Sequence, residues 1–233
     1  MERIKTLSLL SGILGFVVVA LGAWTRLADA GLGCPDWPGC YGFVTIPVSP
    51  EEIDIANSKF PDTPYEVAKA IPEVVHRYFA AALGFFIVCI AYLSVKSKDV
   101  PTNIRNLSVF LLAWVIMQGT FGYWTVSLKL WPQVVTTHLM SGFLTTALLW
   151  LLYFKTKDLI ESRASWNFES TTKRLFSVSI ILVAIQIFLG AWTSTNYASY
   201  SCTDFPLCQG QLLPEANFKE GFNFFQSIGP NYL

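Results

Sequence analysis

Charge is scarce in this sequence. Asp, Glu, Lys and Arg make up 14% of the 233 residues, whereas average soluble domains contain about 25%. The 16 basic residues balance the 16 acidic ones, so the chain offers neither a basic face for nucleic acid nor an acidic tail. Hydrophobic residues reach 53%, and the mean hydropathy is +0.46. These values exclude a soluble globular protein and indicate a protein embedded in lipid.

Five stretches without charge are long enough to cross a bilayer, which takes about 20 apolar residues. They cover residues 6–24, 78–95, 106–128, 130–154 and 175–203. The sequence therefore predicts an all-α integral membrane protein with five crossings, whose termini lie on opposite sides.

Lys and Arg predict the orientation, because cytoplasmic span ends collect them. One side holds ten of them, and the other holds six together with 11 of the 16 acids. The ten are Arg3, Lys5, Lys96, Lys98, Arg105, Lys155, Lys157, Arg163, Lys173 and Arg174. We therefore expect a cytoplasmic N-terminus. A cleaved secretory signal within residues 1–30 is the competing interpretation, but its apolar run is longer than usual and Trp24-Thr25-Arg26 precedes the cleavage-like Ala28-Asp29-Ala30.

Four of the five cysteines fall in the two outward polar segments, as two pairs six residues apart. An oxidising compartment and short loops with prolines favour the disulfides Cys34–Cys40 and Cys202–Cys208. Four unrelated free thiols are the alternative. Cys89, in the middle of the second span, is expected to be a buried apolar residue without a role.

These pairs belong to an internal repeat with an offset of 168 residues. Residues 22–25 recur at 190–193, and the pattern Cys34, Asp36, Pro38, Cys40, Gly42 recurs as Cys202, Asp204, Pro206, Cys208, Gly210. The repeat predicts a four-helix transmembrane bundle in residues 1–160 and, in residues 161–233, the first helix and outer cysteine loop of a second, repeated bundle.

A Gly-x-Trp-Thr ending is shared by the first, third and fifth spans. We interpret it as a packing device, since glycine permits close helix contact, tryptophan sits at the membrane interface and threonine caps the exit.

The only two histidines, His76 and His138, lie near the outer ends of spans two and four. Each follows a proline, Pro72 or Pro132, that suits a first helical turn. Their distances from these prolines predict similar depths, roughly 6 and 9 Å along the helices. A lone histidine would be read as hydrogen-bonded to a neighbouring helix, but two at matched depth favour metal ligation. Two imidazoles do not complete a zinc site, whereas they do complete the axial positions of a haem.

Glu73 lies one helical turn outside His76 and is expected to point into the same pocket. The alternative for Glu73 is an acid favoured by the helix N-terminus, and the alternative for Arg77 is snorkelling to the interface.

The outward motif of residues 25–42, followed by Glu73-x-x-His76-Arg77 and His138, resembles the bacterial haem A synthase family over the whole chain. Members have two four-helix halves related by a pseudo-twofold repeat, and they oxidise the C8 methyl of haem O to the formyl group of haem A. The resemblance implies that residues 1–160 bind haem O between His76 and His138, with Glu73 catalytic, Arg77 in the binding site, and the Cys34–Cys40 loop over the pocket.

The resemblance also implies a haem b between histidines of the second half, which this sequence does not contain, so we expect a truncated or split synthase. It further implies a bacterial inner membrane location with periplasmic cysteine loops. The implied partners are haem O, lipids, haem O synthase, cytochrome oxidase assembly proteins and a chain that supplies the rest of the second half.

Two other functions remain open. A membrane thiol oxidoreductase could pass electrons from the cysteine pairs to quinone, although such sites usually have Cys-x-x-Cys spacing. A bis-histidine protein could carry electrons or haem without altering the porphyrin, and Glu73 would distinguish it from an oxidase.

Overall fold

The computed structural model describes residues 1–162, 168–202, 204, 206–212, 214–215 and 217–225. Three residues used in the predictions lie outside these ranges. They are Arg163 of the charge count, Thr203 at the end of the predicted fifth span, and Phe205 of the second cysteine loop.

Five long apolar helices confirm the predicted membrane-spanning, all-α class. They are α1 (Glu2–Leu27), α3 (Val67–Lys96), α4 (Thr102–Ser127), α5 (Pro132–Ile160) and α6 (Ser170–Thr195). The short helices are α2 (Pro50–Lys59), the 3-10 turn Ala198–Ser201 and α7 (Phe218–Gly221). In the described ranges no strand forms, and β-type pairing is limited to two isolated bridges, Cys40 with Phe43 and Cys208 with Gln211.

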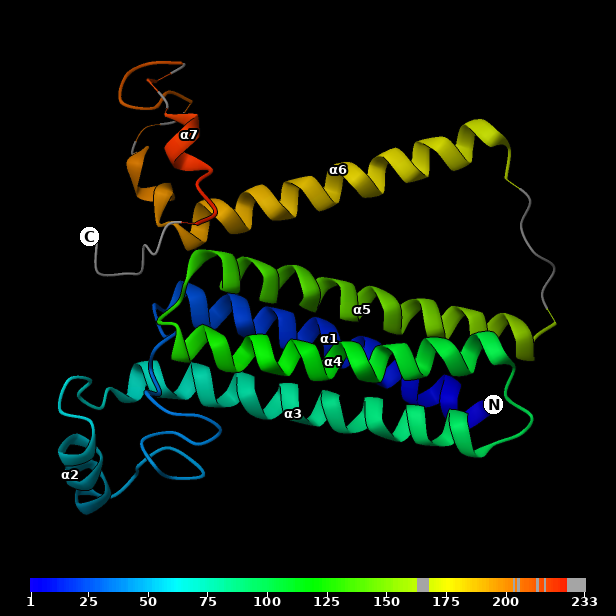
Figure 1. The fold of residues 1–233 in the computed structure, drawn as a ribbon, viewed down its shortest axis with the longest axis horizontal. Coiled ribbons are helices and arrows are strands. Elements are labelled where there is room, and N and C mark those ends of the chain that lie inside the picture. Colours follow the sequence, from blue (N-terminus) through cyan, green and yellow to red (C-terminus); the bar gives the residue numbers. More distant parts are fainter. Residues whose placement is uncertain (163–167, 203, 205, 213, 216, 226–233) are drawn as a thin grey trace.

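The helices α1, α3, α4 and α5 form a bundle in which each packs against two others (Figure 1). α1 contacts α3 and α5, and α4 contacts the same two, so α3 and α5 lie diagonally opposite each other. An apolar core fills the end of the bundle near the N-terminus, with Ile87, Ile104, Leu149 and Leu152 fully buried.

Two predicted helix limits were wrong. α3 begins at Val67, eleven residues before the charge-free stretch at 78–95, because charged residues in its outer turns do not interrupt the helix. Pro72 is consequently inside α3 and not in its first turn, whereas Pro132 does start α5. α6 ends at Thr195, eight residues before the predicted end, since Tyr197 takes a left-handed backbone conformation (φ 55°) and stops the helix.

The segment between α1 and α3 forms a small outer layer with its own core. Cys34, Cys40, Tyr41 and Ala56 are buried in it, and the Tyr41 ring meets Phe60 and Tyr65 edge-on. Burial raises the pKa of Tyr41.

Helix α2 of the same layer begins with a capping box formed by Ser49 and Glu52. This layer covers the end of the bundle opposite the N-terminus (Figure 1).

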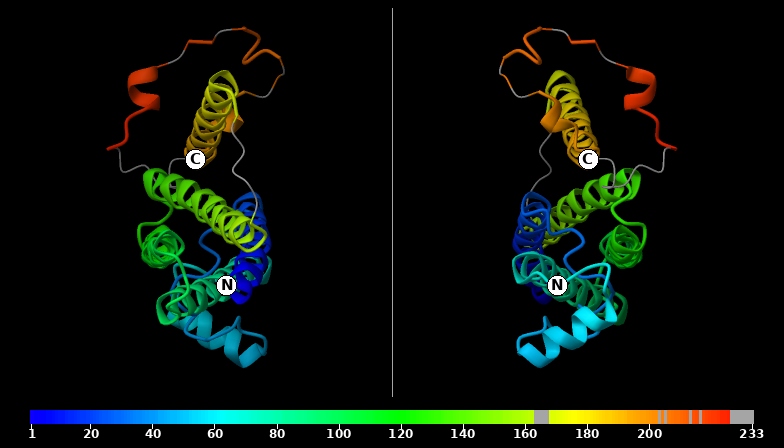
Figure 2. Two further views of the ribbon diagram at one scale, coloured as in Figure 1. Left: turned by 90° about the vertical axis from the view of Figure 1, so that its right-hand side faces the viewer. Right: turned by 90° about the vertical axis from the view of Figure 1, so that its left-hand side faces the viewer.

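Helix α6 lies outside the bundle and approaches α5 towards its own C-terminal end (Figures 1 and 2). Arg26 at the end of α1 donates to the hydroxyl and the carbonyl oxygen of Ser194, and its guanidinium lies 4.0 Å from the Tyr197 ring centroid. Arg26 and Ser194 are 168 residues apart, which is the repeat offset. Contact between equivalent positions is what a twofold relation between the two copies produces.

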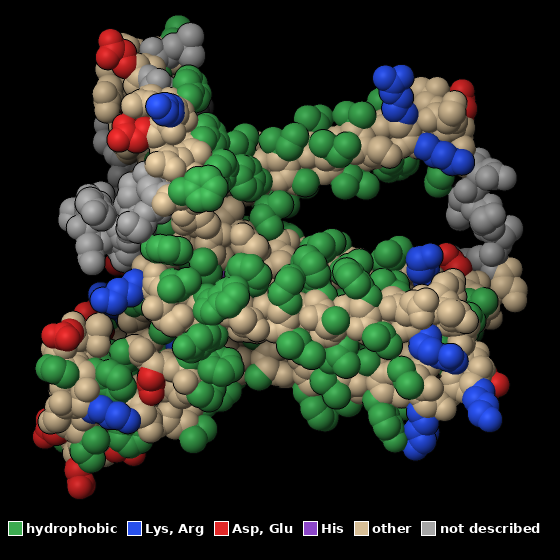
Figure 3. Space-filling view, in the orientation of Figure 1, with side chains coloured by type: hydrophobic (Ala, Val, Ile, Leu, Met, Phe, Trp, Pro, Cys, Tyr) green, Lys and Arg blue, Asp and Glu red, His purple; other side chains and the backbone are tan. Residues whose placement is uncertain are grey.

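Hydrophobic side chains cover the long helices between the two ends of the molecule (Figure 3). Lys and Arg side chains gather at the end that holds the N-terminus, while Asp and Glu are concentrated around the outer layer. The surface is therefore that of a protein with an apolar band between two polar ends.

Candidate functional site

The two histidines belong to the diagonally opposed helices α3 and α5. Both side chains are half-buried, and both lie towards the end of the bundle that carries the outer layer. A group held between them would therefore lie across the bundle, flanked by α1 and α4.

The two imidazoles differ in their hydrogen bonds. His76 Nδ1 lies 3.1 Å from the Val18 carbonyl oxygen, which can only accept, so Nδ1 carries the proton and Nε2 keeps its lone pair. Such a bond to the far nitrogen is the usual support of a metal-ligating histidine. His138 Nδ1 is buried and has no hydrogen-bond partner in the described part of the chain. Two imidazoles from opposed helices are donors of the kind that bind a haem iron.

Each histidine ring rests on the glycine of a Gly-x-Trp-Thr ending. A Cβ added at Gly22 of α1 would lie 3.1 Å from His76 Cε1, and one at Gly122 of α4 would lie 3.3 Å from His138 Cε1. Gly190, the third member, has no atom within 4 Å among the described residues. The motif was interpreted as general helix packing; in its first two copies the glycine makes room for a histidine ring.

Thr25, the threonine of the first Gly-x-Trp-Thr ending, links α1 to α3, the helix that carries His76. Thr25 Oγ1 donates to the Pro72 carbonyl oxygen of α3 at 3.2 Å as well as to Leu21 of its own helix at 3.0 Å. It therefore fixes α1 against the turn of α3 that precedes His76.

Glu73 and Arg77 of α3 form hydrogen bonds with the segment between α1 and α3, and we call this pair of residues the clasp. Glu73 is 4% exposed, and its Oε2 accepts the Cys34 backbone N–H at 2.9 Å, while its Oε1 accepts from Arg77. Arg77 also donates to the carbonyl oxygens of Asp36 at 2.8 Å and Gly39 at 2.5 Å. Oε2 of Glu73 is thus directed to Cys34 and Oε1 to Arg77. The assignment of Glu73 as catalytic stays a prediction, as does a haem contact of Arg77.

The structure joins Cys34 with Cys40 and Cys202 with Cys208, and Cys89 is free and half-buried. In the first cysteine turn (residues 34–42) the Asp36 carboxylate accepts the N–H groups of Tyr41 and Gly42 at 2.6 and 2.7 Å.

The second cysteine turn (residues 202–210) repeats this geometry in its described residues. Asp204 accepts from Gln209 and Gly210 at 2.8 Å each, and these two bonds lower the pKa of Asp204. Gly42 and Gly210 both have positive φ, 83° and 77°, as the turn requires. The repeat found in the sequence is therefore a repeat of structure.

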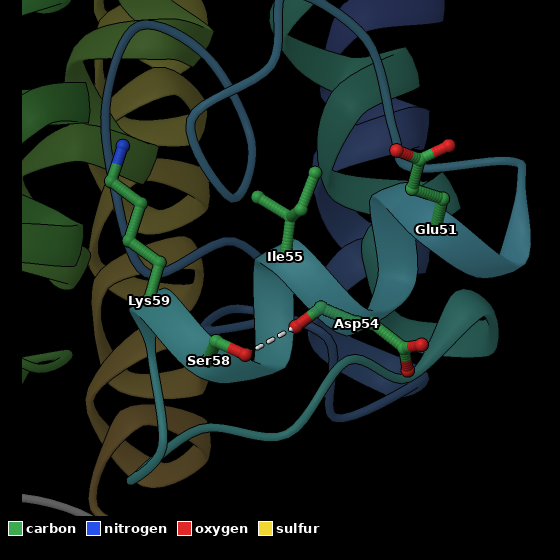
Figure 4. A pocket seen from close by; sticks show the side chains of 5 residues that line it. All are labelled: Glu51, Asp54, Ile55, Ser58 and Lys59. Atoms are coloured by element: carbon green, nitrogen blue, oxygen red, sulfur yellow. Dashed lines mark hydrogen bonds between the residues drawn. The ribbon is translucent and has the colours of Figure 1, made fainter.

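A hollow lies on the surface of α2 and is lined by Glu51, Asp54, Ile55, Ser58 and Lys59, so neither histidine lines it (Figure 4). The Ser58 hydroxyl in it already donates to the Asp54 carbonyl oxygen at 2.7 Å. Within the described residues no group of three or more His, Cys, Asp or Glu side chains is placed to hold a metal ion. The histidine pair remains the arrangement with the clearest chemistry.

Comparison with known proteins shows the family of the chain. Residues 5–228 match the family described as cytochrome oxidase assembly protein, COX15-CtaA. The chain belongs to this family.

Curated relatives of this cytochrome oxidase assembly family carry the name heme A synthase. The protein of Shewanella oneidensis is 41% identical over 216 residues, which are 93% of this chain and 64% of the relative. That of Symbiobacterium thermophilum is 25% identical over 238 residues, 98% of this chain and 71% of the relative. The chain thus spans about two thirds of the length of these relatives. No solved structure matches it.

Proposed function

We propose that this chain takes part in haem A biosynthesis as the haem O-binding half of a haem A synthase. One observation carries the proposal: His76 and His138 come from diagonally opposed helices, and each ring rests on the glycine of a repeated motif. The name of the relatives and the family match support it. The reaction is the oxidation of the C8 methyl group of haem O to a formyl group.

The residues of α3 and α5 have separate roles in this proposal. His76 and His138 hold the haem iron, and the Val18 carbonyl oxygen orients the His76 ring. Iron and porphyrin supply the redox chemistry when bound. Glu73 accepts protons released as the methyl group is oxidised, or holds the hydroxylated product by a hydrogen bond.

The proposal includes a location and an orientation. The protein spans a bacterial inner membrane with the N-terminus in the cytoplasm and both cysteine turns in the periplasm, as the gathering of Lys and Arg near the N-terminus favours. Residues 1–160 form the half that binds haem O. Residues 161–233 belong to the second half, to which the same proposal assigns a resident haem b.

A passive haem carrier is the second candidate. One observation favours it. Both oxygens of Glu73 already accept hydrogen bonds, one from Cys34 and one from Arg77, as expected of a carboxylate with a structural role. Such a protein would share every haem ligand and would release haem O unchanged.

Haem analysis distinguishes the two. The chain is expressed together with the part of a curated relative that it does not span, in a bacterial host that makes haem O but no haem A, and extracted haems are separated by chromatography. The synthase proposal expects haem A, and Glu73→Gln should lower it about 100-fold or more, as on loss of a general base, while bound haem stays near the wild-type amount. Unaltered haem O bound to the wild-type chain would instead identify a carrier, and absence of bound haem would overturn both candidates.

A further inference from the structure

The clasp connects the first cysteine turn to α3 through two side chains. Arg77 bonds the carbonyl oxygens of Asp36 and Gly39 in the first cysteine turn and the carboxylate of Glu73 on its own helix. Glu73 in turn accepts the N–H of Cys34. The turn is therefore held from both of its ends, and His76 lies between the two gripping residues in the sequence of α3.

Arginine is suited to this task because its planar guanidinium presents five donors in fixed directions. One Arg77 side chain can thus serve a carboxylate and two carbonyl oxygens at once. Lysine carries the same charge but is a compact point charge without this fork.

The second cysteine turn provides a natural comparison. It has the same disulfide spacing and the same aspartate-centred bonds, but no Arg or Glu side chain bonds it in the described part of the chain. Cys34 and Cys40 are 0% exposed, whereas Cys202 is exposed and Cys208 half-buried. The clasp and the outer core around Tyr41 account for this difference.

We propose that Arg77 is a positioning residue that couples the disulfide turn to Glu73. The closed turn holds the Glu73 carboxylate in place beside His76, and the engaged clasp in return shields the Cys34–Cys40 disulfide from reductants. Both directions follow from one coupling free energy, which is reciprocal between the parts it joins. The proposal rests on the proposed function only where haem conversion is the readout.

Disulfide reduction in the full chain tests the coupling directly. The chain is reconstituted in lipid vesicles and treated with a phosphine reductant, the thiols are trapped with a maleimide, and each cysteine is quantified by mass spectrometry. Reduction of a buried disulfide follows the population of the open turn. In the wild type, Cys34–Cys40 should be reduced about 10-fold or more slowly than Cys202–Cys208, since charged hydrogen bonds hold the first turn closed.

The matched variants are Arg77→Gln, Glu73→Gln and Tyr78→Phe. The first two should speed reduction of Cys34–Cys40 about 10- to 100-fold, the loss expected for charged hydrogen bonds, and leave Cys202–Cys208 unchanged. Tyr78 is the control, because its hydroxyl donates to Val44 of the same outer layer at 2.7 Å and makes no hydrogen bond to the turn among the described residues. Tyr78→Phe should leave both rates within about twofold, the size of a weak exposed hydrogen bond.

Arg77→Lys separates bridging from charge. It should resemble Arg77→Gln, because lysine cannot reach the carboxylate and the turn together; wild-type behaviour of this variant would overturn the bridging role. An unchanged rate for Cys34–Cys40 in Arg77→Gln would overturn the coupling. Equal acceleration of both pairs would also overturn it, since that result reports a general loss of fold.

Haem conversion gives the second readout. In Arg77→Gln, the haem A formed per bound haem should fall about 10-fold, because a general base out of place loses part of its effect. A wild-type chain that makes no haem A would contradict the proposed function and leave the reduction result standing. Normal conversion by Arg77→Gln would contradict the positioning role alone.

Discussion

The two cysteine turns show what a shared motif does and does not determine. Asp36 and Asp204 accept the same pair of backbone N–H groups, and Gly42 and Gly210 share a left-handed conformation. The local sequence thus determines the shape of each turn. Burial of the disulfide differs, because only the first turn meets a helix that carries Glu73 and Arg77. The motif determines the backbone shape of each turn, and the residues packed around the turn determine how far its disulfide is buried.

The largest difference should follow from removing each disulfide. By loop-closure entropy, Cys34→Ser with Cys40→Ser and Cys202→Ser with Cys208→Ser should each cost roughly 2–3 kcal/mol. The first pair should cost more than the second, because it also buries two hydroxyls and loosens the clasp. Thermal melting of the purified variants measures the difference. Equal melting temperatures would mean that the first turn is no more integrated than the second.

Gly22 and Gly190 occupy equivalent positions in the two copies of the repeat, and they can be compared by substituting each with alanine. Gly22→Ala places a methyl group 3.1 Å from the His76 ring and should turn the ring off its bond to Val18, whereas Gly190→Ala meets nothing within 4 Å in the described chain. Haem affinity should fall about 10-fold in the first variant, as on loss of an outer-shell partner, and stay unchanged in the second. Haem titration followed by absorbance measures both. Similar affinities in the two would show that Gly22 serves packing alone.

The smallest predicted effect is the response of the second cysteine turn to acidic pH. Because backbone N–H groups lower the pKa of Asp204, the second turn is fully stabilised above the aspartate's ordinary pKa of about 4, and it loosens as pH falls through the lowered value. Hydrogen exchange of the Gln209 and Gly210 amides, corrected for intrinsic pH dependence, should show lost protection below about pH 4 and none between pH 5 and 7. In Asp204→Asn the dependence should vanish. A dependence that persists in that variant would assign it to another group.

Sequence reasoning was strongest where the signal was local or periodic. The five spans, the cysteine spacing and the repeat all appear in the helices and turns of the structure. Helix ends were less predictable, since α3 carries Glu73 and Arg77 in turns that a search for charge-free residues passes over. The Ser49-Pro50-Glu51-Glu52 pattern is a capping signal that would have predicted α2.

The clasp and the glycine contacts could not be predicted from the sequence. Each depends on which helices become neighbours, and a single chain without its packing does not reveal that Gly22 faces His76 or that Arg77 reaches Gly39. The repeated Gly-x-Trp-Thr ending was the available signal. It marked positions of close approach without naming the partner.

The central claim is that the first copy is a haem site built from His76 and His138. The most direct measurement is the reduced absorbance spectrum of the purified chain after loading with haem O, for the wild type and for His76→Ala, His138→Ala and the double variant. The account predicts a low-spin spectrum with two axial imidazoles in the wild type, conversion to high spin in each single variant, and loss of bound haem in the double variant. A double variant that binds haem with an unchanged low-spin spectrum would contradict it.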